Sequence, residues 1–166
     1  MKLILFTFCT ICNVYFSQEN IYSIFTSEKG YSIEIPKSFE KSTNSNKFDL
    51  KFTDDYGASI LVLINDRNSD ELKITPHDID TKELEKALKS VFPNYKISWY
   101  EKINISNKKA ILIESIGSYS STLKSLVCEI YVNEKVYSIT CSASITSYQD
   151  YKTLFLKVIK SIKFKS

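Results

Sequence analysis

The sequence predicts an α+β fold, an α/β/α layered sandwich built on a mainly antiparallel, twisted sheet of six or seven strands. Two segments, residues 58–64 and 110–113, are apolar on both faces of a strand, which is typical of central strands covered from both sides. Two others, residues 81–92 and 147–162, carry apolar side chains at helical spacing and can supply the covering layers. The remaining strand segments alternate apolar with polar residues around short turns, which favours antiparallel pairing.

The first 18 residues have the layout of a secretory signal peptide. Lys2 gives a positive start, residues 3–16 are apolar, and Ser17 and Gln18 are small or polar. As a helix the apolar run would reach only about 21 Å, less than the roughly 30 Å of a bilayer core. An uncleaved anchor or a buried first helix is the alternative. We therefore predict an exported protein, secreted or periplasmic, with no integral membrane span after signal cleavage.

The rest of the chain has the size of one domain. Residues 19–29 are predicted to be a polar lead-in segment, and residues 30–166 a single domain. The 166 residues are 43% hydrophobic and 25% charged, which is ordinary for a globular protein. The net formal charge of +3 is too small to make nucleic acid the main partner. We expect a monomer.

Alternation defines the strands of the first half. Residues 30–36 alternate apolar and polar side chains until Pro36 ends the strand. Residues 48–53 alternate in the same way and lead into a turn at residues 54–57, whose Asp and Gly content favours a hairpin. Residues 58–64 then return as a central strand.

Two amphipathic helices are predicted. In residues 81–92 the apolar side chains recur at i, i+3, i+4, i+7 and i+8. Asp80 with Glu83 forms a plausible N-terminal cap, and Pro93 stops the helix. Residues 147–162 show the same spacing, with lysines toward the C-terminal end that suit the helix dipole.

Further strands are predicted at residues 96–105 and near residues 109–116. The first of them has four apolar side chains on one face: Ile97, Trp99, Ile103 and Ile105. Both lie between the two predicted helices along the chain.

The last predicted hairpin brings two cysteines together. Apolar residues alternate in both of its strands, and a two-residue loop at Glu134 and Lys135 places Cys128 directly opposite Cys141. Opposite residues of an antiparallel ladder have Cα atoms about 4.5 to 5.5 Å apart, within the reach of a disulfide. An exported protein can keep such a bond. Two buried free thiols that act as small apolar side chains are the alternative.

Motifs for catalysis or for metal and cofactor binding are weak. His77 is the only histidine, and one histidine with two cysteines on a distant hairpin falls short of the three or four convergent ligands of zinc. The chain has neither a G-x-S-x-G elbow nor a Gly-rich phosphate loop. We therefore predict no catalytic residue, no cofactor and no metal. A hydrolase that uses His77 is a remote alternative.

Aromatic residues give the clearest hint of a binding surface. They make up 13% of the chain, and Tyr100, Tyr119 and Tyr131 fall on the polar faces of their strands. An aromatic-lined groove at these tyrosines is one interpretation, and packing against a helix is the other.

The order of the segments resembles the PsbP-like superfamily. The resemblance rests on Gly-Tyr-Ser-Ile-Glu-Ile-Pro at residues 30–36, Val-Tyr-Ser-Ile-Thr at residues 136–140, and Ser-Ile-Lys-Phe at residues 161–164 after the last helix. It spans about residues 28–164. That superfamily includes the extrinsic photosystem oxygen-evolving subunit, a Ran-binding nuclear import factor and many exported bacterial proteins of unassigned role. The resemblance implies an antiparallel sheet between helical layers and a role in binding or assembly. It implies no functional residue.

These observations favour an exported, non-catalytic binding or assembly module for an unknown protein partner. The alternative is a small-molecule or lipid carrier with an apolar pocket between sheet and helix.

Overall fold

The computed structural model describes residues 21–42, 47–68, 73–117 and 123–165. Along the chain the elements are β1 (Tyr22–Ser27), β2 (Tyr31–Pro36), β3 (Glu40–Lys41), β4 (Leu50–Thr53), β5 (Ser59–Asp66), the 3₁₀ turn η2 (Pro76–Asp78), α1 (Thr81–Lys89), β6 (Lys96–Ile105), β7 (Lys108–Ile116), β8 (Leu123–Val132), β9 (Lys135–Ser144), α2 (Tyr148–Lys160) and β10 (Lys163–Phe164). The predicted signal peptide, residues 1–18, lies outside the described residues. Within the described part, neither helix is long and apolar enough to cross a membrane.

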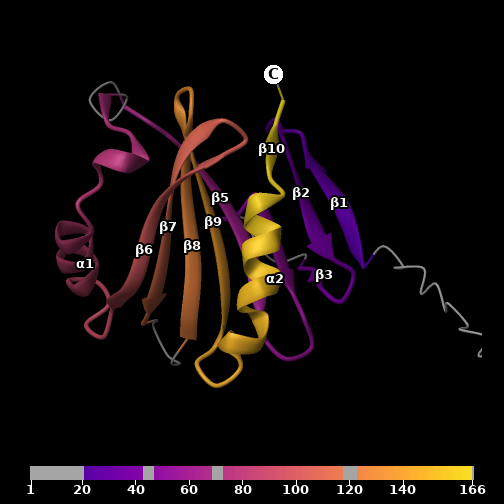
Figure 1. Ribbon diagram of the computed structural model, residues 1–166. Helices are drawn as coiled ribbons and strands as arrows, with labels where there is room; N and C mark the ends of the chain where they lie inside the picture. The colour runs from indigo at the N-terminus through magenta and orange to yellow at the C-terminus, as the bar shows by residue number, and fades with distance from the viewer. Residues whose placement is uncertain (1–20, 43–46, 69–72, 118–122, 166) are drawn as a thin grey trace, which may run out of the picture.

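A seven-stranded sheet forms the centre of the molecule. Its order is β3-β4-β5-β9-β8-β7-β6, and every neighbouring pair is antiparallel. In Figure 1, α2 lies against one face of this sheet and α1 lies beside β6 at its edge. The predicted α+β sandwich with a mainly antiparallel sheet of six or seven strands is confirmed.

A second, three-stranded sheet joins the two ends of the described chain in the order β1-β2-β10. Residues 19–29, for which the sequence predicts only a lead-in segment, contain strand β1. Their pattern gave no signal because β1 is an edge strand: Phe25 packs inward on Tyr31 and Phe52, whereas Ile24 is 74% exposed. Pairing with β2 supplies the backbone hydrogen bonds that hold β1 in place.

The hydrophobic core lies between α2, β2 and one face of the seven-stranded sheet. From α2 the core takes four buried side chains: Tyr148, Phe155, Val158 and Ile159. From β2 it takes alternate residues: Tyr31, Ile33 and Ile35. Each fully buried aliphatic or aromatic side chain contributes about 1.5–3 kcal/mol, so this side of the sheet carries most of the stabilising burial.

The other face of the sheet is covered unevenly. In β7 both faces are buried, and Ile111 and Ile113 are at most 2% exposed on the side opposite to α2. In β5 the corresponding residues, Leu61 and Leu63, are only half-buried. The cover comes from η2, which contacts β7 and β8, and from α1, which contacts β6 and has no buried residue. Cover is therefore complete over β7 and partial over β5.

The register of the last hairpin differs from the predicted one by two residues. The loop consists of Asn133 and Glu134, so Cys128 pairs with Ile139 and Cys141 pairs with Leu126. The prediction that the two cysteines lie directly opposite each other is wrong. Asn133 has φ 54, a left-handed conformation that asparagine tolerates better than most residues. Both cysteines are buried free thiols in this structure.

Candidate functional site

Strand β6 forms one edge of the seven-stranded sheet and contains a β-bulge. Ile97 pairs with Ser115 and Trp99 pairs with Glu114, so Ser98 is the extra residue. Adjacent residues of β7 face opposite sides of the sheet. Ile97 therefore lies on the side of α1, and Trp99 lies on the side of α2. The expectation that Ile97 shares a face with Trp99, Ile103 and Ile105 is wrong, because one inserted residue reverses the alternation.

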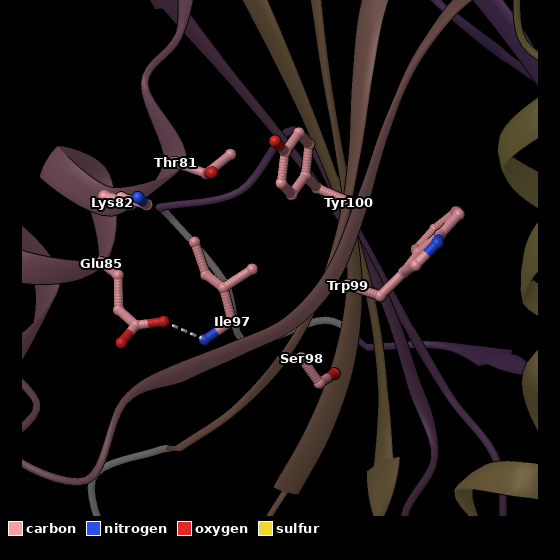
Figure 2. Close-up of a pocket in the computed structure, with 7 residues that line it drawn as sticks. All are labelled: Thr81, Lys82, Glu85, Ile97, Ser98, Trp99 and Tyr100. Atoms are coloured by element: carbon pink, nitrogen blue, oxygen red, sulfur yellow. Dashed lines mark hydrogen bonds between the residues drawn. The ribbon is translucent and has the colours of Figure 1, made fainter.

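A groove of about 430 Å³ runs between α1 and the beginning of β6. We call it the α1 groove; its lining is Thr81, Lys82, Glu85, Ile97, Ser98, Trp99 and Tyr100 (Figure 2). Glu85 closes its base by accepting a hydrogen bond of 2.8 Å from the backbone N–H of Ile97, as Figure 2 shows. Lys89 donates to the same carboxylate at 2.6 Å, and the two hydrogen bonds lower the pKa of Glu85.

Large side chains remain exposed around the α1 groove. Trp99 is 40% exposed and Tyr100 is 48% exposed. We call this surface (Trp99, Tyr100 and the α1 groove) the α1–β6 rim. Tyrosine and tryptophan supply large contact areas at low cost in conformational entropy, so the rim is suited to contact with a macromolecule.

A second groove, of about 630 Å³, lies between β6 and α2 on the opposite side of the strand. We call it the α2 groove. It is lined by Trp99, Glu101, Ile103, Asn104, Ile105, Ser106 and Leu112 of the sheet and by Lys152, Leu156 and Lys160 of α2. Trp99 borders both grooves because the bulge places it at the point where the two faces meet.

A buried carboxylate lies at the Trp99 end of the α2 groove. Glu114 is 5% exposed and forms ion pairs of 2.7 Å with both Lys124 and Lys152. Tyr148 donates to it at 3.1 Å, as does the hydroxyl of Ser98 in the bulge. Burial by itself would raise the pKa of Glu114, but the hydrogen bonds from the lysines and the tyrosine outweigh it and lower the pKa to about 2. The cluster joins α2, β7, β8 and the bulge through one charged centre.

No family model matches the chain, and no curated protein matches it in sequence. Solved structures do match. The cyanobacterial PsbP (CyanoP) of Synechocystis sp. PCC 6803 superimposes with a TM-score of 0.66 at 16% identity, over 86% of this chain and 92% of that chain.

This chain has the PsbP-like fold.

Two other solved structures with this fold support the assignment. The Ran-binding protein Mog1p of Saccharomyces cerevisiae matches with a TM-score of 0.57 at 9% identity, over 86% of this chain and 95% of that chain. LpqN of Mycobacterium tuberculosis, involved in cell envelope biogenesis, matches with a TM-score of 0.61 at 8% identity, over 87% of this chain and 91% of that chain. The predicted resemblance to the PsbP-like superfamily is confirmed at the level of the fold.

Tyr100 and Tyr131, two of the three tyrosines proposed as a binding surface, are not brought together in this PsbP-like fold. Tyr100 lines the α1 groove, whereas Tyr131 lies beneath the guanidinium of Arg67, 4.3 Å from the ring centre. Tyr100 pairs with Ile113 of β7, which pairs with Val127 of β8. Tyr131 is four residues further along β8, a distance of about 13 Å at the usual rise of a strand. Tyr119 lies outside the described residues.

His77 lies in η2, away from both cysteines. Its Nε2 is 3.0 Å from the carbonyl oxygen of Ile103, and its own carbonyl accepts a hydrogen bond from Lys102. These contacts connect η2 to β6. In the described part of the chain, no group of three or more histidine, cysteine, aspartate or glutamate side chains could hold a metal ion.

Sequence reasoning missed the contacts that the lysines of α2 make. The sequence related the lysines of this helix only to its dipole. In the structure Lys152 pairs with Glu114, the ammonium group of Lys157 lies 3.7 Å from the ring centre of Tyr22, and Lys160 lines the α2 groove. One signal was available. Lys152 and Lys160 flank Leu156 at i, i+4 and i+8, so the three side chains share one helix face.

Proposed function

We propose that this chain is an exported, non-catalytic binding or assembly module whose protein partner docks on the α1–β6 rim. The observation that carries the proposal is the pair of exposed aromatic side chains, Trp99 and Tyr100, beside a groove on an edge strand. Tryptophan and tyrosine are the residue types that most often dominate binding energy at protein interfaces.

Three further features support a docking role for the rim. Trp99 and Tyr100 are consecutive residues of one strand, so they face different sides of the sheet edge and offer aromatic surface on both. Charged side chains of both signs, Lys82 and Glu85 among them, surround the aromatic pair and can form the polar margin of an interface. The name of the yeast protein with this fold describes it as Ran-binding, which is consistent with the use of the fold as a binding module.

Export follows from the predicted signal peptide. We propose that residues 1–18 are removed and that the mature protein acts outside the cytoplasm, in the periplasm or in the medium. Edman sequencing of the protein from the exported fraction of its source cells tests this proposal. A first residue near position 19 supports it, and retention of Met1 on a cytoplasmic protein contradicts it.

The docking site is tested by partner capture from the same exported fraction. Wild-type protein is expected to retain one partner in stoichiometric amount. Tyr100→Ala and Trp99→Ala should each weaken that complex by about thirtyfold or more, the effect of losing an interface hot spot. Tyr56→Ala is the matched control, because Tyr56 is 86% exposed in a turn outside the rim.

The possible results test two statements separately: that the protein binds a partner, and that the partner docks on the α1–β6 rim. A stoichiometric partner that binds all variants equally rules out the rim as the docking site. Absence of any stoichiometric partner contradicts the binding function itself. Titration calorimetry with the purified partner gives the affinities for this comparison.

A carrier of small molecules or lipids is the second candidate function. The observation that favours it is the α2 groove, whose volume of about 630 Å³ falls within the usual range of ligand sites. Its position between helix and sheet is the one that the sequence suggested for an apolar pocket.

A further inference from the structure

The residues that line the α2 groove are regularly spaced on both α2 and β6. From α2 it takes Lys152, Leu156 and Lys160, one side chain per turn. From β6 it takes the alternate residues that follow the bulge: Trp99, Glu101, Ile103 and Ile105. The two lysines are eight residues apart, about 12 Å along the helix axis. The groove is therefore elongated, with a lysine toward each end.

The floor of the groove is aliphatic. Leu112 and Ile105 are buried at its base, and Ile103 and Leu156 are partly buried along its walls. Trp99 stands at one end with its ring 5.8 Å from the ammonium group of Lys152. An apolar surface therefore runs from the tryptophan to the opposite end of the groove. Burial of a hydrocarbon chain along this surface is favourable, because it removes apolar area from water.

The other end is polar and positively charged. Lys160 lines it together with Asn104 and Ser106, and Lys160 has no carboxylate within 4 Å in the described part of the chain. Lys152 differs, because Glu114 already binds it at 2.7 Å. The lysine available to an incoming anion is therefore Lys160.

The charges around the groove limit the charge of a ligand. Five charged side chains line the groove or form its charged end: Lys124, Lys152 and Lys160 are positive, and Glu101 and Glu114 are negative, so their net charge is plus one. A monoanion neutralises this charge, whereas a dianion would leave an excess negative charge beside Glu101. An apolar path that ends at one available ammonium group matches an alkyl chain with a single carboxylate.

We propose that the α2 groove binds a single-chain amphiphile with a carboxylate head group. The carboxylate pairs with Lys160 beside Asn104, and the alkyl chain lies over Ile103 and Leu156 toward Trp99. The inference specifies the ligand of the carrier function and does not depend on protein docking at the α1–β6 rim.

Trp99 allows a direct test because it is the only tryptophan of the chain. Decanoate, added below its micelle concentration to the mature protein, is expected to shift the tryptophan emission saturably, and equilibrium dialysis should give one bound decanoate per chain. Decanol has the same chain without the charge and should bind about tenfold more weakly, since a hydrogen bond to a charged group is lost. Decylamine, with the opposite charge, should bind more weakly still.

Two substitutions should move the affinity in opposite directions. Lys160→Gln is expected to weaken decanoate about tenfold and to leave decanol unchanged. Glu101→Gln should strengthen decanoate binding by about threefold, because it removes a like charge at an exposed position beside the groove. Lys163→Gln is the matched control: Lys163 is exposed in β10 and lines neither groove.

The proposal fails if decanoate shows no saturable binding, if decanol binds as tightly, or if Lys160→Gln and Lys163→Gln behave alike. Circular dichroism and thermal melting of each variant establish that it is folded before its affinity is compared. Tyr100→Ala separates this proposal from the protein-docking one, because it should reduce partner capture while leaving decanoate affinity unchanged.

Discussion

The two helices carry the same apolar spacing in the sequence but occupy different environments. α2 buries Tyr148, Phe155, Val158 and Ile159 between the two sheets. α1 lies beside the edge strand β6, and none of its residues is buried. Both ends of α2 are tied to the core, by Glu114 at the beginning and by β10 at the end. α1 is capped by Asp80, and a hydrogen bond from the backbone of Ile97 to Glu85 connects it to β6.

The difference shows that an amphipathic pattern predicts a helix without predicting how deeply the helix is buried. The weakly packed helix borders the exposed aromatic side chains, and the strongly packed helix supplies the wall of the α2 groove. Because the two helices differ in burial, we expect similar substitutions to lower the free energy of unfolding by different amounts in α1 and α2.

The largest expected effect is on the core side of α2. Phe155→Ala should lower the free energy of unfolding by about 3–5 kcal/mol, because it leaves a cavity in a fully buried site. Leu88→Ala, the matched change in half-buried α1, should cost about 1 kcal/mol or less. Urea denaturation measures both. Equal losses would contradict the contrast between the helices.

The charged centre that anchors α2 should produce the next effect. Glu114→Gln leaves two lysines without their shared carboxylate and is expected to cost about 3 kcal/mol, measured by urea denaturation at neutral pH. Glu85→Gln, which removes a carboxylate charge at the more exposed α1 contact, should cost less than about 1 kcal/mol. A larger loss of stability in Glu85→Gln than in Glu114→Gln would contradict the view that α2 is anchored more firmly than α1.

The same carboxylate makes stability depend on pH. The pKa of Glu114 is lowered from an ordinary value of 4.5 to about 2 in the folded protein. Its contribution is therefore fully present above about pH 4.5 and is lost as the pH falls toward 2. Thermal melting between pH 6 and pH 2.5 should show a shallower acid loss for Glu114→Gln than for the wild type. If the melting temperatures of the wild type and Glu114→Gln fall in parallel with pH, Glu114 is not responsible for the acid loss of stability.

A smaller and local effect is expected at the cap of α1. The Asp80 side chain accepts hydrogen bonds from the backbone of Lys82 and Glu83 at 2.8 and 3.4 Å. Asp80→Ala should cost about 1 kcal/mol. Hydrogen exchange should detect this cost as faster exchange within α1 and unchanged exchange within α2. Faster exchange in both helices would mean that they form one cooperative unit.

The smallest effect concerns the two buried cysteines, Cys128 and Cys141. Because both are free thiols, we expect a reductant to leave the mass of the protein unchanged. Burial raises the pKa of both Cys128 and Cys141, so thiol reagents should not label them in the folded protein. The mass of the intact mature protein should be the same with and without reductant. A mass two units lower before reduction would establish a disulfide and contradict the register of this hairpin.

Local patterns predicted the elements of regular structure well. Alternation identified β2 and β4, and a run of residues that is apolar on both faces identified β5. Helical spacing identified both helices, with Asp80 as the N-cap of α1. The end of α1 was less accurate: the helix stops at Lys89, so Val91 and Phe92 lie beyond it. Strand β1 was missed because its inward residues, Phe25 and Ser27, include a polar one, so apolar and polar side chains do not alternate along it.

The candidate site was predicted less well because it depends on contacts between distant segments. Tyr100 was identified from its place on the polar face of a strand, and it does line the α1 groove. The bulge at Ser98 could not be predicted, because its position is set by the pairing of β6 with β7. The role of Lys160 was missed because the helix face on which it lies becomes a groove wall only when β6 is placed opposite.

By itself, the sequence determined which segments are strands and helices and which of their faces are apolar, since these properties follow from the period of side chains along a few turns or residues. Only the tertiary structure decided the strand register, the depth at which each helix lies, and which lysines are neutralised. Those properties depend on which distant residues meet, and many partners satisfy the same local pattern. The two grooves belong to this second class, because each has one wall on β6 and another on a helix.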